Sequence, residues 1–202
     1  MSEPRDETVE LVRHEVAFQG YFKVGRYFFR HSLFQGGTSD VISREVFECG
    51  QVGAILPYDP RRDEIVLIRQ FRAGSYVCGR HPFGWEIPAG ILEPGETPET
   101  LVVRELKEEA NIVVKRIERL YTLTLSPGAL AQSCTLFVGE TDAATAGGIF
   151  GVASEGENIL VKTFTLSEAL AMTAHNEIDN MVGVCALQWL ALNRNELRKR
   201  WA

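Results

Sequence analysis

Three closely spaced glutamates are the strongest chemical signal in the sequence. Glu105, Glu108 and Glu109 lie three or four residues apart, so on an α-helix they would share one face. Like charges at this spacing repel one another, and Lys107, the only lysine of the stretch, points away from them. A hard divalent cation would stabilise such a face, because Mg²⁺ prefers carboxylate oxygens combined with phosphate and water. The alternative interpretation is an acidic, solvated surface helix.

The helix that would carry these glutamates has clear start and stop signals. Thr97 is predicted to cap its N-terminus, and Pro98 would occupy the first helical position, where a missing N–H costs nothing. Asn111 is predicted to end the helix in the left-handed conformation that glycine usually adopts there. The helical spacing predicts an apolar side made of Val102, Val103, Leu106 and Ala110.

The stretch from Gly90 to Ile112 resembles the Nudix box. In that motif a glycine, five residues, a glutamate and seven residues precede Arg-Glu-apolar-x-Glu-Glu-x-Gly-apolar. The matching positions are Gly90, Glu96, Arg104, Glu105, Leu106, Glu108, Glu109 and Ile112. Asn111 stands where the family has its last glycine, and asparagine tolerates the same backbone conformation. The resemblance implies a hydrolase with an α/β/α sandwich around a mixed sheet that uses Mg²⁺, with Mn²⁺ as the alternative ion.

The resemblance also implies roles for individual residues. The metal ligands would be the backbone carbonyl of Ala89 and the carboxylates of Glu105, Glu108, Glu109 and Glu157.

Arg104 would orient one of the box carboxylates, with an ordinary surface ion pair as the alternative. The general base would be Glu155, in the glycine-rich loop 147–156, because a glutamate that binds metal is a weak base. Glu108 is the other candidate catalytic carboxylate. The alternative for Glu155 and Glu157 is a pair of solvated loop acids.

Outside the box, the chain resembles the ADP-ribose pyrophosphatase subfamily over nearly its whole length. The subfamily's diagnostic proline matches Pro127. By this resemblance Tyr21 would stack on adenine, while Arg72 and the partner subunit's Arg44 would hold ribose or phosphates. Gln132 lies in a stretch where the subfamily often carries an acidic residue that reaches the terminal ribose, so the preferred sugar stays open.

The implied reaction is hydrolysis of ADP-ribose to AMP and ribose 5-phosphate. One alternative is hydrolysis of another nucleoside diphosphate sugar, such as a GDP- or ADP-hexose. An alternative of another class is a Nudix-fold module that binds nucleotides without catalysis. Three mutually repelling glutamates argue against this last alternative, because a pure binder would not need them.

The composition of the chain limits the classes of partner that it could bind. The chain has 202 residues, 45% of them apolar, and a net charge of -6, which disfavours a nucleic-acid backbone as partner. It contains no apolar run of the ~20 residues that a membrane span needs. The N-terminal residues are polar and acidic, unlike a signal peptide. Four scattered cysteines without metal-binding spacing predict reduced thiols and a cytoplasmic protein.

The pattern of elements predicts an α+β protein with two parts. Residues 1–49 form a strand-rich, aromatic segment with turns at Gly20, Gly25 and Gly36-Gly37, which we predict to be a dimerisation sheet. Intrachain packing of its aromatic residues is the alternative. Residues 50–202 would be the Nudix domain.

Within the second part, strands are predicted at 51–59, 64–72, 116–125, 134–140 and 158–165, with a loop at 73–82. Ser167 is predicted to cap a short helix that runs to His175. A longer helix would follow from Ile178 to Lys199. Its buried face would contain Met181, Val184, Leu187 and either Leu190 or Ala191. Strands and helices do not alternate regularly, which argues against a doubly wound sheet.

Overall fold

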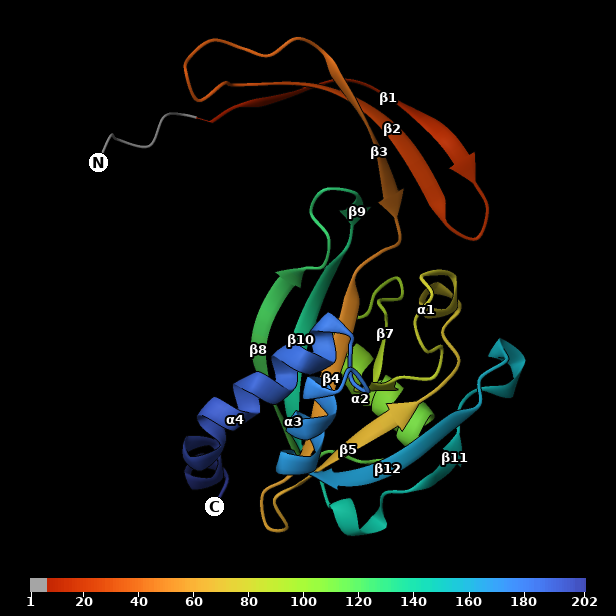
Figure 1. Cartoon of the computed structure of the whole chain (residues 1–202), viewed down its shortest axis with the longest axis vertical. Helices are drawn as coiled ribbons and strands as arrows, with labels where there is room; N and C mark the ends of the chain where they lie inside the picture. The colour runs from red at the N-terminus through yellow and green to blue at the C-terminus, as the bar shows by residue number, and fades with distance from the viewer. Residues whose placement is uncertain (1–6) are drawn as a thin grey trace. The chain divides into compact units, whose positions relative to one another are not determined.

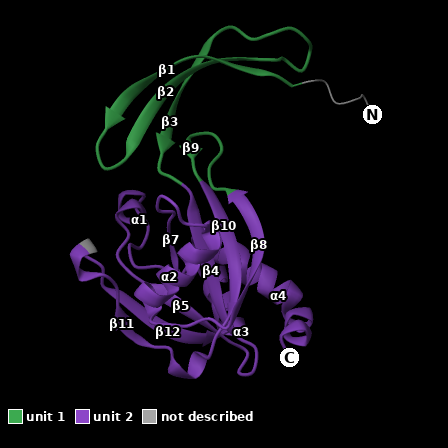
Figure 2. Cartoon of the chain, turned by 180° about the vertical axis from the view of Figure 1, so that it is seen from behind, with its two compact units in different colours: residues 1–50, 124–132 green, residues 51–123, 133–202 purple. Residues whose placement is uncertain are grey.

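The computed structural model describes residues 7–202, apart from the side chain of Glu155, and it contains mixed sheets and few helices (Figure 1). The described residues form two compact units (Figure 2). The first contains the described residues up to Gly50 together with 124–132, and the second contains Gln51–Leu123 and Ser133–Ala202.

The first unit is a sheet of four strands in the order β1-β2-β3-β9. They are β1 (Val9–Gln19), β2 (Lys23–His31), β3 (Ile42–Glu48) and β9 (Leu130–Ala131). The first three are antiparallel, and β9 runs parallel to β3. The turn expected at Gly25 is wrong, because this residue lies within β2 opposite Val46. A glycine is needed there for space, since a Cβ atom would lie 2.4 Å from Glu48 Oε1.

The second unit is built on a mixed sheet whose main strand order is β11-β12-β5-β4-β10-β8. These strands are β4 (Val52–Asp59), β5 (Glu64–Arg69), β8 (Arg116–Thr124), β10 (Ser133–Glu140), β11 (Gly148–Phe150) and β12 (Ile159–Thr165). The short strands β6 (Trp85–Glu86) and β7 (Ala89–Ile91) pair with β5 and β4. β4 is parallel to β10 and antiparallel to β5, so the sheet is mixed as predicted.

Helices cover both faces of this sheet. The helix α2 (Pro98–Ala110) lies on one face, and α3 (Leu166–Ala174) and α4 (Met181–Trp201) lie on the other (Figure 1). The core between the sheet and α2 contains Ile55, Val66 and Ile68 of the strands and Val102 and Leu106 of the helix. The α/β/α sandwich that the sequence predicts is therefore confirmed.

Two details of the predicted helix faces are wrong. Val103 is 44% exposed and its place in the core is taken by Leu101, which packs with Val102 above Gly53. On α4, Leu187 and Leu190 are buried as expected, but Met181 is 56% exposed because it is the first residue of the helix.

The caps of the last two helices also differ from the prediction. Thr165, rather than Ser167, caps α3, because its hydroxyl accepts from the Glu168 amide while the Glu168 carboxylate accepts from the Thr165 amide. The longer helix starts three residues later than predicted, after Asn180, whose side chain accepts from the Gly183 amide at 2.8 Å.

Several short elements occur where loops were expected. The helix α1 (Ala73–Val77) lies in the predicted loop 73–82 and contains no buried residue, so no apolar periodicity marks it. The glycine-rich loop contains β11 and a 3₁₀ turn, Ala153–Glu155. A further 3₁₀ turn covers Ala143–Thr145. Among the described residues, no helix has the length and apolar character required to span a membrane.

Candidate active site

The helix α2 presents the box glutamates, and its ends are as the sequence predicts. Thr97 Oγ1 accepts from the Thr100 amide at 3.2 Å and Pro98 is the first helical residue. Asn111 ends the helix in the left-handed region, with φ 52°. The Asn111 side chain accepts a hydrogen bond from Lys107 at 2.5 Å, which keeps the lysine beside the C-terminal end of α2. Both ends are therefore held by side chains, so the orientation of the glutamates is well determined.

Arg104 connects three carboxylates of the box. Its Nε lies 2.8 Å from Glu96, and its Nη1 lies 3.0 Å from both Glu105 and Glu108. Glu96 also accepts from the Glu93 amide at 3.0 Å, so it braces the turn before α2 as expected. One buttressed guanidinium thus offsets part of the repulsion between Glu105 and Glu108.

Glu109 is the most buried of the three helix glutamates, with 2% of its surface exposed. It accepts hydrogen bonds from Gln70 Nε2 at 3.2 Å and from the Ala89 amide at 3.0 Å. Burial and the neighbouring charge of Glu105 raise the pKa of Glu109 to about 8. A carboxyl group in this environment gains stability in its charged form from any cation that binds beside it.

Glu105 is packed against the backbone of Gly90. A Cβ atom at position 90 would lie 1.7 Å from Glu105 Oε1, so only glycine leaves room for the carboxylate. Burial raises the pKa of Glu105, Arg104 opposes this shift, and the charges of Glu108 and Glu157 add to it. The first glycine of the box therefore has a steric reason to be there.

A cavity of about 330 Å³ lies beside these residues, between β4, β7 and the start of α1. Its lining includes Ala89, Glu86 and Arg72. The Arg72 guanidinium forms an ion pair with Glu86, with Nε 3.0 Å and Nη2 2.8 Å from Oε2. Burial alone would lower the pKa of Arg72, but Glu86, Glu109 and Glu157 raise it overall. An arginine held in this way is suited to bind a phosphate group.

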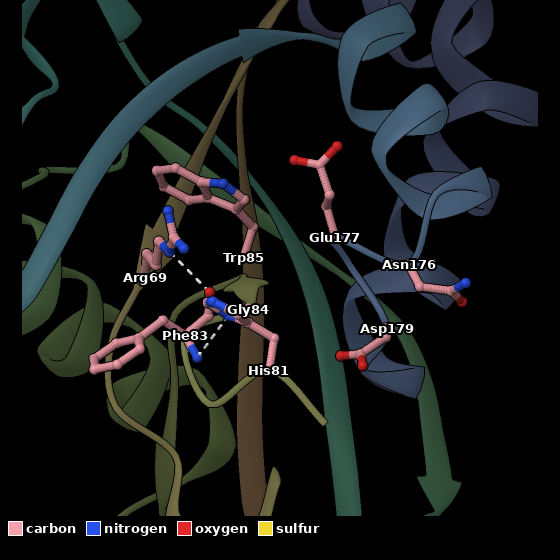
Figure 3. A pocket seen from close by; sticks show the side chains of 8 residues that line it. All are labelled: Arg69, His81, Phe83, Gly84, Trp85, Asn176, Glu177 and Asp179. Carbon is pink, nitrogen blue, oxygen red and sulfur yellow. Dashed lines mark hydrogen bonds between the residues drawn. The ribbon is translucent and has the colours of Figure 1, made fainter. Parts of the chain in front are cut away.

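Another cavity, of about 280 Å³, borders β6 (Figure 3). Trp85 and Glu86 are consecutive in this strand, so their side chains point to opposite faces and line different cavities. Arg69 lies over the Trp85 ring and donates to the Phe83 carbonyl, while Glu177 and Asp179 approach from the other side (Figure 3). This cavity therefore has mixed charge, and the box glutamates line neither this cavity nor the Arg72 cavity.

The glycine-rich loop holds one of the two predicted loop acids in a defined place. Glu157 accepts from the Val152 amide at 2.9 Å, and its charge contributes to the raised pKa values of Glu105 and Glu109. Glu157 therefore lies close enough to Glu105 and Glu109 for its charge to oppose their ionisation. The side chain of Glu155, the predicted general base, lies outside the described residues.

The predicted substrate residues divide between the two units. Arg72 lies in the second unit, whereas Tyr21, Arg44, Pro127 and Gln132 belong to the first. Tyr21 is 90% exposed and contacts the ring of Phe22 edge-on, so most of its own ring surface is available for stacking.

As placed, the carboxylates are paired with protein groups rather than arranged around one point. In the described part of the chain, no three Asp, Glu, His or Cys side chains form a group that could hold a metal ion. The physical reason is visible for Glu105 and Glu108, which turn toward Arg104. A cation would have to compete with this arginine for their oxygens.

Three features of the site were not anticipated from the sequence. Gln70 supports Glu109, Glu86 supports Arg72, and Gly90 makes space for Glu105. Gln70 is a polar residue, 7% exposed, that directly follows the apolar strand β5. A polar side chain at the end of a buried strand was the signal that could have identified it.

Comparison with known proteins agrees with this geometry. A family model described as the NUDIX domain matches residues 50–194. An ADP-ribose pyrophosphatase of Escherichia coli (strain K12) is 41% identical over 194 residues, which cover 96% of this chain and 93% of that protein. One from Haemophilus influenzae is 37% identical, with 96% and 91% covered.

More distant relatives are also found. A GDP-mannose pyrophosphatase of Enterobacter sp. is 31% identical, with 92% of this chain and 96% of that protein covered. A crystal structure described as an ADP compounds hydrolase superposes with a TM-score of 0.69 at 18% identity, covering 95% of this chain and 97% of the other. That likeness supports the fold alone. The family model matches most of this chain, and the relatives align with it almost end to end. The chain therefore belongs to the Nudix family.

Proposed function

We propose that this protein hydrolyses the pyrophosphate bond of ADP-ribose in a Mg²⁺-dependent reaction that gives AMP and ribose 5-phosphate. The observation that carries the proposal is the identity of 41% to an ADP-ribose pyrophosphatase across nearly the whole of both chains. The box glutamates on α2 are all present. Arg72, at the N-terminus of α1, lines the cavity that also borders Ala89, and we take this as the catalytic cavity.

The chemistry of the donor set suits a divalent cation, which would draw Glu105 and Glu108 away from Arg104. Glu109 is buried beside Glu105, and these two carboxylates raise each other's cost of ionisation until a cation binds. Glu105 and Glu109, the Ala89 carbonyl, and Glu108 and Glu157 would hold Mg²⁺, with Mn²⁺ as the alternative ion. When bound, the ion would neutralise phosphate charge and stabilise the leaving phosphate.

The protein's own residues supply binding and proton transfer. Arg72, fixed by Glu86, would hold a substrate phosphate through its free N–H groups. Glu155 would accept the proton of the attacking water, because the glutamates of the box would be engaged with the cation. Gly151 and Gly156 have positive φ values of 109° and 73°, which glycine adopts readily, and they would allow this loop to close.

We further propose that the active enzyme is a homodimer in which the first unit completes the site. Long apolar side chains on β1, among them Val9, Leu11 and Phe18, are 72%, 54% and 60% exposed. They would be buried in a dimer. Tyr21 would then stack on adenine, the partner subunit's Arg44 would hold ribose or phosphate, and Pro127 and Gln132 would border the terminal ribose.

The compartment and the partners are part of the same proposal. The four cysteines are unpaired, which fits a reducing compartment, and we propose the cytoplasm. The ligand would be a small nucleoside diphosphate sugar, without nucleic acid or membrane as partners.

The second candidate substrate is another nucleoside diphosphate sugar. It is favoured by the 31% identity to a GDP-mannose pyrophosphatase and by Gln132, which lacks the charge of an acidic residue.

A substrate panel tests the proposal. ADP-ribose, ADP-glucose and GDP-mannose are compared by kcat/KM, with Mg²⁺, with Mn²⁺ and with EDTA. We expect ADP-ribose to give the highest value and EDTA to abolish turnover. A higher kcat/KM for GDP-mannose would select the second candidate. Binding of ADP-ribose without any Mg²⁺-dependent release of AMP would select the non-catalytic module. Light scattering at micromolar concentration tests the dimer, and a fully active monomer would contradict it.

A further inference from the structure

A strongly basic cavity lies at the opposite end of β4 from the catalytic cavity. It has a volume of about 580 Å³, and its lining includes Arg61, Lys115, Arg116 and Arg198. Ala54 of β4 lines the catalytic cavity, whereas the basic cavity begins at Pro60, just after the strand ends. Six residues of extended chain separate these positions by about 20 Å. The two cavities are therefore separate sites.

The positive charges in this cavity are only partly neutralised. Glu140 is 4% exposed and serves two cations, with Lys115 Nζ 3.4 Å from Oε1 and Arg116 Nε 2.7 Å from Oε2. The contact between Arg116 Nε and Glu140 Oε2 has the distance of an ion pair but not the alignment of a hydrogen bond. Glu140 Oε2 therefore has no hydrogen-bond donor among the described residues. Glu140 is thus the only side-chain carboxylate of the cavity lining, and it is shared.

Arg61 and Arg198 supply the uncompensated charge. The guanidinium groups of both residues form no ion pair with any described residue, and both residues are exposed. The lining thus contains four basic side chains and one acidic side chain. The chain as a whole has a net charge of -6, so this accumulation runs against its average.

Stabilisation of the α4 terminus explains only part of this cluster. Cations in the last turn of a helix interact favourably with its dipole, and Arg198, Lys199 and Arg200 all lie there. Lys199 pairs with Glu196 and Arg200 with Glu118, whereas Arg198 turns to the cavity. Arg61, Lys115 and Arg116 come from other elements, so the dipole gives no reason for their convergence.

We propose that this cavity is a second binding site, independent of metal, for a small anion that carries one or two phosphate groups. Arg61 and Arg198 would bind the phosphate oxygens directly, since the guanidinium fork matches them in pairs. Lys115 and Arg116, which are paired with Glu140, would add positive charge to the cavity without contacting the phosphate directly. The volume is in the range of small-molecule sites. The catalytic site differs in kind, because its glutamates admit a pyrophosphate only together with a cation.

Calorimetry with inorganic pyrophosphate in the presence of EDTA tests this site on the full chain. The double variant Arg61→Ala/Arg198→Ala should weaken binding by roughly tenfold or more, because two charge-assisted contacts are lost. Lys199→Ala is the matched control, since it removes one positive charge from the same helix end outside the cavity lining. Arg72→Ala removes the arginine of the catalytic cavity.

The proposal expects one pyrophosphate to bind wild type, Lys199→Ala and Arg72→Ala with similar Kd, and binding should weaken as salt is raised. Turnover of ADP-ribose without added pyrophosphate should be the same in the double variant and in wild type. Absence of binding to wild type in EDTA would overturn the proposal. So would loss of binding in Arg72→Ala with retention in the double variant, because the anion would then occupy the catalytic cavity. An equal loss of pyrophosphate affinity in Lys199→Ala would also overturn the proposal, because binding would then depend on general surface charge.

Discussion

Replacement of Gly90 by alanine should separate metal binding from folding. The new Cβ atom would lie 1.7 Å from Oε1, 2.1 Å from Cδ and 2.7 Å from Cγ of Glu105. Gly90 does not have a positive φ, so an alanine there causes no backbone strain of its own. The whole perturbation therefore falls on the position of one carboxylate.

The size of each effect follows from this geometry. The end of the Glu105 side chain can rotate away, so the cost should be near the lower limit for overpacking, about 1 kcal/mol. For a chain of this length that corresponds to a fall in Tm of roughly 2–4 °C. The displaced carboxylate can no longer reach the cation, and the Mg²⁺ concentration for half-maximal activity should rise by roughly 10–100-fold, the scale seen when support of a metal site is lost.

The assay is Mg²⁺ titration of AMP release, combined with thermal melts without metal. Gly84→Ala is the control, because its Cβ atom would meet no other atom closer than 3.6 Å. Glu105→Gln provides the reference for loss of the carboxylate charge. If the two residues act through one contact, Gly90→Ala/Glu105→Gln should be no worse than Glu105→Gln alone. A Gly90→Ala protein with the Mg²⁺ requirement of wild type would refute the reasoning.

Four further substitutions test other parts of the structure. Glu109→Gln should abolish most turnover and keep or slightly raise apo stability, because it replaces a carboxyl group whose ionisation is opposed by burial and by Glu105. Wild-type turnover at saturating Mg²⁺ would disprove its role as ligand. Glu155→Gln should lower kcat by roughly 10²-fold or more with little change in KM. Glu157→Gln should lower turnover and also raise the Mg²⁺ requirement. A Glu155→Gln protein with the kcat of wild type would place the base elsewhere. For Asp59, burial would raise the carboxyl pKa, but three backbone N–H donors lower it below its usual value. Its ionised form therefore stabilises the fold above about pH 4, and this contribution is lost as pH falls through the folded pKa. Asp59→Asn should be about 1–3 kcal/mol less stable in urea at pH 7, and a difference that does not shrink in acid would contradict this.

The sequence predicts well those parts of the structure that depend on local rules. Thr97, Pro98 and Asn111 determine α2 through capping and backbone conformation, and these depend only on neighbouring residues. The strands β4 and β10 are apolar enough to be recognised without their partners. Elements without a buried side are different. The helix α1 buries nothing, so no periodicity marks it.

Contacts between distant residues account for most of what the sequence does not predict. Gln70 and Glu109 are 39 residues apart, and nothing in either local pattern links them. Gly25 was expected in a turn because glycine often is, but it lies within β2, where Glu48 of the neighbouring strand β3 leaves no room for a side chain. Val103 was assigned to the core from its helical angle, while the position of β4 beneath α2 selects Leu101 instead. In each case a residue far away in the sequence decides the outcome.

The charges around the box explain why the site needs a cation before it can accept its proposed substrate. Six carboxyl groups, Glu86, Glu96, Glu105, Glu108, Glu109 and Glu157, interact there with two arginines, so full ionisation would leave an excess of four negative charges, and the raised pKa of Glu109 reflects this cost. Arg104 is shared by three of these carboxylates, and Arg72 is paired with another. A pyrophosphate would add further negative charge in a partly buried place, where screening by salt is weak. Metal and substrate should therefore bind with positive coupling, each raising the affinity for the other by the same factor. Arg72 adds to this coupling, because Glu86 holds its guanidinium on the cavity wall whether or not the cation is bound.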